Sequence, residues 1–274
     1  MNAPQKTRPP LKPLDSALAD LLAQAHPLAE TETVATFDAD GRVLAQDCTS
    51  ALHVPPLDNS SMDGYAVRCA DVREVAVTLP VSQRIAAGSA GEPLAPGTAA
   101  RIFTGAPVPA GADAVLMQED CEAIATAEGG VAVRINAVPQ PGQWIRRAGE
   151  DIARGTVVLA AGTRLSPAEL GLAASIGLHQ LQVARRPRVA LFSTGDELVM
   201  PGDVPPEQMP PGAIYNSNRF FLRAMLLRLG CEVTDFGIVP DRLDATIDAL
   251  REASAAHDLI LTSGGVSVGE EDHI

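Results

Sequence analysis

Three apolar runs in the last third of the chain alternate with stretches in which apolar residues recur every three or four positions. Continuous apolar runs are typical of strands buried on both faces, and the longer spacing is typical of amphipathic helices. The pattern predicts strands over residues 189–193, 232–239 and 258–262, and helices over residues 219–229 and 244–255. Strands and helices that alternate at this spacing predict a βαβαβ unit with right-handed crossovers and a parallel sheet.

The pattern is different between residues 54 and 182, where short apolar or alternating runs are separated by turns rich in glycine and proline. Such runs predict compact all-β structure, a barrel or a sandwich, with strands near residues 75–81, 114–118, 131–135 and 156–159. One helix interrupts them. Ser166 is suited to its N-cap, Pro167 to its first position and Glu169 to a capping box, so we expect a helix that ends at Gly177.

Two further helix ends are indicated by capping residues. Asn218 is expected to cap the helix over residues 219–229, which should end at Gly230. Near the N-terminus, Asp15 or Ser16 is expected to cap a helix that ends near His26. The residues before that helix contain prolines and basic side chains but no apolar h-region, so they do not read as a secretory signal.

Composition restricts the partners and the kinds of site. A formal net charge of −13 and few aromatic residues argue against nucleic acid or an anionic membrane surface as the main partner. No apolar stretch approaches the length of a membrane span. The four cysteines form no CxxC pair, which favours reduced cysteines in a cytosolic protein over a disulfide framework or a structural zinc site.

Candidate chemistry is concentrated after the three predicted parallel strands, because ligands of open parallel sheets bind beyond the carboxyl ends of the strands. Three polar loops fall there: Gly195-Asp196-Glu197, Pro240-Asp241, and Ser263-Gly264-Gly265 with three acids after it. Glycines let backbone N–H groups approach an anion closely, whereas neighbouring carboxylates repel it unless a divalent cation lies between them. The loops therefore predict a site for a phosphorylated ligand and a divalent ion.

The acids of these loops are not equivalent. Glu197 and Asp272 each follow a glycine turn that directs them toward the crevice, and Asp241 ranks next. The remaining acids have simpler explanations: Asp196 as a helix cap, and Glu270 and Glu271 as solvated charges.

Three segments nearer the N-terminus also carry polar side chains on predicted bends. They contain Asp63, Thr104, and the pair Arg146-Arg147, whose guanidinium groups could hold an anion. Taken singly, each is more often a structural turn or a solvated charge pair.

Five motifs occur together in a fixed order: MDGYA at residues 62–66, TGAPVP at 104–109, RRAGED at 146–151, LFSTGDEL at 191–198 and SGGVSVGEED at 263–272. In this combination the chain resembles the molybdopterin molybdenumtransferases, the MoeA and gephyrin E-domain family. The resemblance extends from about Leu14 to the last residue.

The resemblance implies an activity and its partners. Members of the family insert molybdate into the dithiolene of adenylylated molybdopterin and release AMP in the presence of Mg²⁺. They are elongated dimers, with the active site between the α/β domain of one subunit and the β-rich domain of the other. We therefore expect a cytoplasmic homodimeric molybdenum insertase that binds adenylylated molybdopterin and molybdate, with the molybdopterin adenylyltransferase as a further partner.

The resemblance also implies roles for individual residues. The acids matched to the pterin-phosphate and metal site, as catalytic residues and metal ligands, are Glu197, Asp241 and Asp272. The residues matched to the phosphate loop and to other cofactor contacts are Ser263, Gly264, Gly265, Gly195, Asp151 and Arg147. Asp63 and Thr104 match catalytic residues that the partner subunit brings to the cleft.

The expected fold is α/β plus a β-rich domain. An elongated N-terminal linker domain would comprise residues 1–53 and 140–186, an all-β domain residues 54–139, and a truncated, molybdopterin-binding-like parallel-sheet domain residues 187–274. The resemblance implies that the rest of that sheet and a C-terminal β domain are missing. The alternatives are therefore a catalytically incomplete module for molybdopterin binding or dimerisation, and a nucleotide-phosphate enzyme of the related adenylyltransferase fold, which the MDGYA segment argues against.

Overall fold

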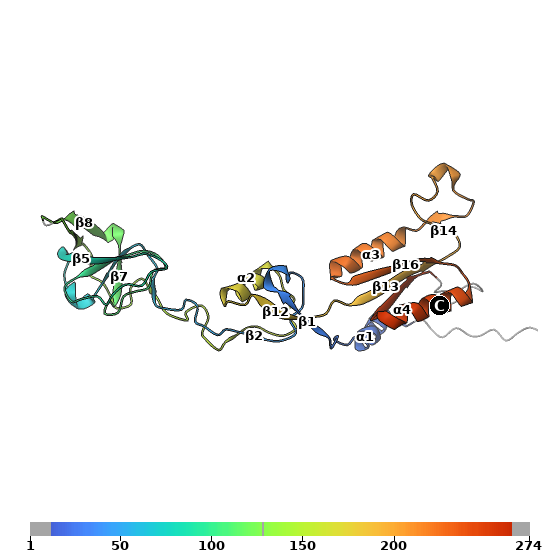
Figure 1. Ribbon diagram of the computed structural model, residues 1–274, viewed down its shortest axis with the longest axis horizontal. Helices are drawn as coiled ribbons and strands as arrows, with labels where there is room; N and C mark the ends of the chain where they lie inside the picture. Colours follow the sequence, from blue (N-terminus) through green and yellow to red (C-terminus); the bar gives the residue numbers. More distant parts are fainter. Residues whose placement is uncertain (1–11, 128, 265–274) are drawn as a thin grey trace, which may run out of the picture. The chain divides into compact units, whose positions relative to one another are not determined.

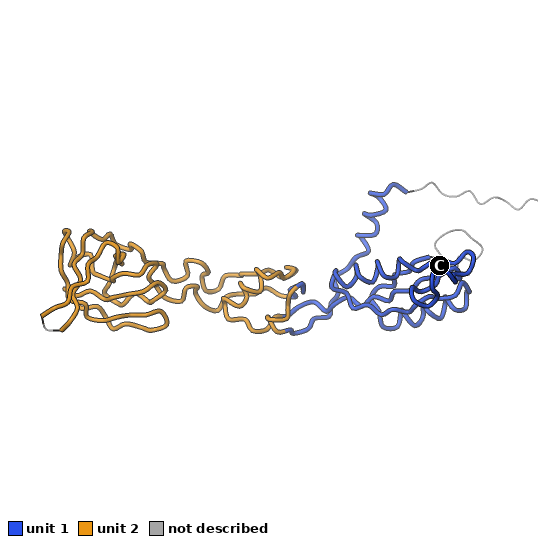
Figure 2. Tube along the Cα trace, turned by 90° about the horizontal axis from the view of Figure 1, so that it is seen from above, with its two compact units in different colours: residues 1–34, 41–45, 182–274 blue, residues 35–40, 46–181 orange. Residues whose placement is uncertain are grey.

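A computed structural model describes residues 12–127 and 129–264 of the chain. The chain folds into two compact units (Figure 2). The first, which we call the α/β unit, comprises residues 1–34, 41–45 and 182–274. The second, which we call the β-rich unit, comprises residues 35–40 and 46–181. Figure 1 labels several of the helices and strands of each unit.

The α/β unit contains the predicted βαβαβ unit. Strands β13 (Arg188–Thr194), β16 (Glu232–Val239) and β17 (Leu259–Ser263) pair in parallel in the order β16-β13-β17. Helix α3 (Ser217–Leu229) lies between β13 and β16 in the sequence, and α4 (Leu243–Ala256) between β16 and β17. Because the two crossovers run in opposite directions across the sheet, right-handed connections place α3 and α4 on opposite faces (Figure 1).

Strand β13 is the centre of this unit because its sequence is apolar on both faces. Val189, Ala190, Leu191 and Phe192 are completely buried. The pattern is the continuous apolar run expected of a parallel strand covered by helices on both sides. The next two residues, Ser193 and Thr194, are also buried, so polar side chains follow the apolar run inside the unit.

Helix α3 begins two residues earlier than its sequence indicates. Its N-cap is Asn216, whose side-chain oxygen accepts a hydrogen bond from the Arg219 N–H at 3.2 Å. The prediction that Asn218 caps this helix is therefore wrong. Both Asn216 and Asn218 have side chains suited to an N-cap. The start of the helix is fixed by a backbone hydrogen bond, which the Asn216 N–H donates to the Val199 carbonyl at 2.9 Å. The helix ends at Gly230 in the left-handed conformation, as predicted.

The other predicted helices are also present. Helix α2 (Pro167–Ser175) has the complete capping box of Ser166 and Glu169, as predicted. Helix α1 (Leu14–Ala23) begins after Pro13 without a side-chain cap, so the prediction of Asp15 or Ser16 as its cap is wrong. Both residues lie inside its first turn, because the helix starts at the position that follows the proline.

The β-rich unit is built on one six-stranded sheet in the order β7-β4-β6-β5-β9-β8. All neighbours are antiparallel except β5 and β6, which are parallel. Its strands are β4 (Gly64–Val67), β5 (Val77–Ile85), β6 (Ala99–Ile102), β7 (Ala114–Met117), β8 (Cys121–Ala125) and β9 (Val131–Ile135). The predicted strand-rich domain beside an α/β domain is therefore confirmed.

Both faces of this sheet are buried at β4. Tyr65 and Val67 belong to one apolar cluster, and Ala66 belongs to the other. Successive side chains of a strand point to opposite faces, so β4 separates two cores. The ends of β4 and β6 are thereby held rigidly, which matters for the polar residues beside them.

Short strand pairs account for the remaining strands. They are β1 (Thr31–Ala35) with β12 (Gln180–Ala184), β2 (Cys48–Thr49) with β11 (Val157–Leu159), β3 (Asn59–Ser60) with β10 (Ile145–Arg146), and β14 (Leu198–Val199) with β15 (Ile214–Tyr215). Within the described residues, no helix is both long enough and apolar enough to cross a membrane.

Candidate functional site

Two of the three predicted polar loops meet at the carboxyl edge of the parallel sheet. The Asp196 N–H donates to a carboxylate oxygen of Asp241 at 3.2 Å, and the Asp241 N–H donates to a carboxylate oxygen of Asp196 at 3.2 Å. This reciprocal pair joins the loop after β13 to the loop after β16. The Asp196 carboxylate therefore fixes a neighbouring loop instead of capping a helix.

The described start of the third loop, Ser263 and Gly264, lies at the same edge. Gly264 has φ +106°, and a Cβ at this position would overlap the Thr194 carbonyl oxygen. Only glycine allows the loop after β17 to lie this close to the end of β13. On its other side, Ser263 accepts a hydrogen bond at 3.3 Å from the Asn218 side chain at the start of α3. The sheet topology thus brings together the first two polar loops and the described start of the third, Ser263 and Gly264, as predicted.

Glu197 lies beside Gly195 in the first of these loops. Gly195 has φ +144°, and a Cβ there would overlap the Glu197 carboxylate. The glycine therefore makes room for an acid that turns back over its own loop. Glu197 is exposed and Asp241 is partly buried, so both carboxylates can be reached from solvent.

Buried polar atoms that the sequence motifs did not single out lie under this edge. The hydroxyls of Ser193 and Thr194 and the side-chain NH₂ of Asn216 are buried, and none has a hydrogen-bond partner in the described part of the chain. Unpaired buried polar groups are unusual in folded proteins. Each can donate a hydrogen bond. Their sequence signal is weak, because a hydroxyl at a strand end and an asparagine before a helix are common structural residues.

The predicted metal site combines residues inside and outside the described chain. Glu197 and Asp241 are described, whereas Gly265 and Asp272, with the acids Glu270 and Glu271, lie outside the described residues. Within the residues that are described, no three His, Cys, Asp or Glu side chains form a group that could hold a metal ion. A site formed by Glu197, Asp241 and Asp272 stays a prediction.

In the β-rich unit, the structure joins two motifs that lie far apart in sequence. The Thr104 N–H and hydroxyl both donate to one Asp63 carboxylate oxygen, at 2.8 and 2.7 Å. These bonds, with a smaller contribution from the Arg101 guanidinium, hold the pKa of Asp63 below its ordinary value. Asp63 is therefore an oriented carboxylate at the ends of β4 and β6.

Glycine is required next to this aspartate. A Cβ on Gly64 would overlap the Leu116 carbonyl oxygen of the neighbouring strand β7. The close approach of β4 to β7 therefore depends on the second residue of the Asp63-Gly64 pair, and it sets where the Asp63 side chain leaves the sheet.

The two arginines of the RRAGED motif have carboxylate partners within the chain. Arg146 donates to both oxygens of Asp151 at 2.6 Å, and Asp151 correspondingly raises the pKa of Arg146. Arg147 donates to Asp58 at 2.6 Å, and the Ala148 N–H bonds the same carboxylate at 2.8 Å. These ion pairs order the loop. A role of Arg147 or Asp151 in binding an external ligand stays a prediction.

Two family matches cover most of the sequence. Residues 12–177 match the family described as "MoeA N-terminal region (domain I and II)", and residues 190–274 match the family described as "Probable molybdopterin binding domain". The first match alone covers more than half of the chain.

The chain belongs to the MoeA family.

Individual MoeA-family proteins are similar over nearly the whole chain. The "Molybdopterin molybdenumtransferase" of Haemophilus influenzae is 41% identical over 94% of this chain and 62% of its own length. The protein of the same name from a Nostoc species is 40% identical over 99% of this chain and 61% of its own length. This chain thus spans about three fifths of the length of these relatives.

A solved MoeA structure has the same fold. The molybdopterin biosynthesis moeA protein of Pyrococcus horikoshii superposes with a TM-score of 0.84 at 32% identity, over 93% of this chain and 67% of that one. The resemblance inferred from the five motifs and the expected fold class are therefore confirmed.

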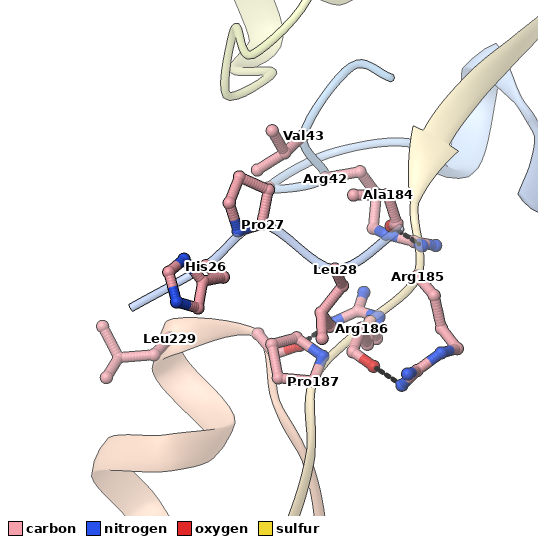
Figure 3. A pocket seen from close by; sticks show the side chains of 12 residues that line it. His26, Pro27, Leu28, Arg42, Val43, Ala184, Arg185, Arg186, Pro187 and Leu229 are labelled. Atoms are coloured by element: carbon pink, nitrogen blue, oxygen red, sulfur yellow. Dashed lines mark hydrogen bonds between the residues drawn. The ribbon is translucent and has the colours of Figure 1, made fainter. Parts of the chain in front are cut away.

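A cavity of about 320 Å³ lies in the α/β unit but away from the polar loops (Figure 3). Pro187 lines it at the amino end of β13, together with apolar side chains such as Leu28, Val43 and Leu229. Arg186 lines the same cavity and donates to the Gly230 carbonyl at 3.1 Å. A positive charge at this position stabilises the C-terminal end of α3 through the helix dipole. The cavity lies at the opposite end of β13 from the loop of Gly195, Asp196 and Glu197.

Proposed function

We propose that this MoeA-family chain carries the molybdopterin-binding and catalytic residues of a cytoplasmic molybdenum insertase. The reaction would transfer molybdate to the dithiolene of adenylylated molybdopterin with Mg²⁺-dependent release of AMP. The observation that carries the proposal is the meeting of the loops after β13 and β16 at one sheet edge, joined by the reciprocal Asp196–Asp241 hydrogen bonds, with Gly264 packed against Thr194 at the same edge. The names of the similar proteins point to the same substrate.

The residues at that edge divide the binding task. The glycine-rich loop of Ser263, Gly264 and Gly265 would present backbone N–H groups to a phosphate. The oxygen donors Glu197 and Asp241, with Asp272, suit a divalent cation such as Mg²⁺, which prefers carboxylate ligands. When bound, Mg²⁺ would supply neutralisation of the pyrophosphate charge and stabilise the leaving phosphate. The buried hydroxyl of Thr194 would add a hydrogen-bond donor beneath the ligand.

The decisive experiment separates catalysis from binding. Purified chain would be mixed with adenylylated molybdopterin, Mg²⁺ and molybdate, with AMP release followed by chromatography and ligand binding followed by equilibrium dialysis. We expect AMP release that requires both Mg²⁺ and molybdate. Binding without AMP release at saturating ligand would exclude the transferase activity for this chain and leave the binding or dimerisation module.

We further propose that the chain forms homodimers with shared active sites. In each site, Asp63 and Thr104 would come from one copy, and Glu197, Asp241 and Asp272 from the other. Mixing Asp63→Ala protein with Glu197→Ala protein should then restore part of the AMP release that each lacks alone, because one site of a mixed dimer is intact. Failure of complementation in a mixture that forms dimers would count against the shared site. A pull-down with the molybdopterin adenylyltransferase would test that partner.

A further inference from the structure

Two arginines of the β-rich unit lie side by side without a carboxylate partner. In the parallel pair β5–β6, Arg84 is the register partner of Arg101. Like charges placed opposite each other on neighbouring strands are destabilising. In the described part of the chain, no Asp or Glu oxygen lies within ion-pair distance of either guanidinium, although the unit pairs other arginines such as Arg146 and Arg147. The juxtaposition is therefore not neutralised by an ion pair.

One aromatic ring holds both guanidinium groups in place. The guanidinium carbon of Arg84 lies 4.4 Å from the centre of the Phe103 ring, and that of Arg101 lies 4.6 Å from it. Arg101 is fixed further by donating to the Gly64 carbonyl at 2.9 Å and to the Gln118 side chain at 2.8 Å. Cation–π contacts at exposed sites contribute modestly and leave the charges in place. The two groups are thus ordered before any ligand arrives.

The acids near these arginines do not engage the guanidinium groups directly. Asp63 lies near Arg101, but one of its oxygens already accepts two hydrogen bonds from Thr104. Glu119 and Asp120 are further acids near Arg101, since both act together with it on the pKa of the Cys121 thiol, but neither forms an ion pair with Arg84 or Arg101 in the described part of the chain. Guanidinium groups bind tetrahedral oxyanions through paired N–H donors, and Arg84 makes no ion pair or side-chain hydrogen bond among the residues that the structure describes.

We propose that Arg84 and Arg101, ordered on Phe103, form an oxyanion-binding site of the β-rich unit for a tetrahedral dianion. Its occupant is a phosphate group or molybdate, two ions that share shape and charge. The site adjoins the Asp63–Thr104 pair. A role of this site in the transfer reaction rests on the proposed function. Its existence depends on the β-rich unit alone.

The test measures anion binding by the full chain in two arms, inorganic phosphate and molybdate, by isothermal titration and by the amide shifts of Thr104 and its neighbours. We expect millimolar binding of one or both ions that weakens with added NaCl. Each of Arg84→Gln and Arg101→Gln should weaken binding about five- to tenfold, and both together should abolish it. The arm with the lower dissociation constant identifies the source of the dianion.

A matched variant guards against a general charge effect. Arg134→Gln removes an exposed arginine of the same sheet whose nearest acid is Glu122 at 3.9 Å, and it should leave both dissociation constants unchanged. Unchanged binding in the Arg84→Gln/Arg101→Gln protein, or no binding by the original chain, would overturn the proposal. Arg84 is exposed, so Arg84→Gln should fold normally even if Arg101→Gln does not. Anion binding that persists in Glu197→Gln protein separates this site from the transferase proposal.

Discussion

Asp63 is the candidate catalytic residue whose state follows most directly from its contacts. Its pKa is held low by the Thr104 N–H and then by the Thr104 hydroxyl. Thr104→Val removes the hydroxyl and keeps the backbone bond, so the pKa of Asp63 should rise part of the way to its ordinary value. Carboxyl resonances followed by NMR during an acid titration would measure it. Thr78→Val, on an exposed position of β5, should leave the Asp63 pKa unchanged, and an unmoved value in both proteins would contradict the assigned cause.

The same hydrogen bonds determine how the contribution of Asp63 to folding stability changes with pH. A carboxyl whose pKa is lower in the folded state stabilises the fold above its unfolded pKa, and the contribution is lost as pH falls through the folded value. Thr104→Val should therefore lower the free energy of unfolding at neutral pH, and this loss should become smaller in acid.

Gly64 is a second single-residue feature, and here the constraint is steric. A side chain at Gly64 would overlap the Leu116 carbonyl. Gly64→Ala should destabilise the β-rich unit by more than about 2 kcal/mol, because backbone on a paired strand cannot move aside cheaply. The fluorescence of Trp144, the single tryptophan, reports urea unfolding of this unit.

The control for Gly64 is a glycine with open space around it. Gly171 lies in α2, where no heavy atom is close to the position that an added methyl group would take, and alanine there should be neutral or stabilising by up to about 1 kcal/mol. Equal effects of the two substitutions would contradict the steric account.

At the scale of the element, the start of α3 can be tested with two neighbouring asparagines. Asn216→Ala removes the side-chain oxygen that caps the helix and should cost about 1 kcal/mol of unfolding free energy. Asn218→Ala changes an exposed side chain whose described contact is a single hydrogen bond to Ser263, and should cost less. Chemical denaturation of both proteins would decide, and a larger loss for Asn218→Ala would contradict the observed cap.

Local patterns predicted the helices α1 to α4 and the three parallel strands, but only some strands of the β-rich unit, and nonlocal contacts explain many of the misses. Strand β16 and helix α2 follow apolar spacing and capping residues that can be read within a dozen positions. The cap of α3 could not be predicted in this way, because two neighbouring asparagines were equally suitable and a backbone bond from Asn216 to Val199 selected one of them. Helix α1 starts directly after Pro13 and has no side-chain cap. The pairing order of the six-stranded sheet, with its parallel pair, has no local signal.

The candidate site shows the same division. Topology alone predicts that the loops after β13, β16 and β17 share an edge. The Asp196–Asp241 bonds confirm it for the first two loops, and the close approach of Gly264 to Thr194 confirms it for the start of the third. The pairing of Asp63 with Thr104, 41 positions apart, required the fold. So did the shared ring of Arg84 and Arg101, which no motif had marked.

At the scale of the whole molecule, a substitution that destabilises one compact unit should leave the stability of the other unit unchanged. Asp258 joins the start of β17 to that of β13: Arg185 donates to both its oxygens at 2.9 Å and the Arg188 N–H at 2.7 Å. Asp258→Asn should destabilise the α/β unit by about 1–2 kcal/mol at neutral pH, seen as faster amide exchange in β13. Trp144 fluorescence should report unchanged unfolding of the β-rich unit.

The pH dependence gives this prediction a second readout. Arg185 first, and then the Arg188 N–H, hold the pKa of Asp258 far below its ordinary value. The stabilisation is complete above the ordinary carboxyl range and is lost only as pH falls through the low folded value, so Asp258→Asn and the original chain should converge in strong acid. Asp248→Asn, on an exposed face of α4, should show neither effect. Equal shifts in both units would contradict their independence.

The central claim is that acids at the carboxyl edge of the parallel sheet support a metal-dependent transfer reaction. Its most direct test is the Mg²⁺ dependence of AMP release from adenylylated molybdopterin in the presence of molybdate. Glu197→Gln should raise the Mg²⁺ concentration for half-maximal release about tenfold or more, whereas Glu207→Gln, an exposed acid of the same unit, should not. No AMP from the original chain, or the same Mg²⁺ requirement in all three proteins, would contradict the account.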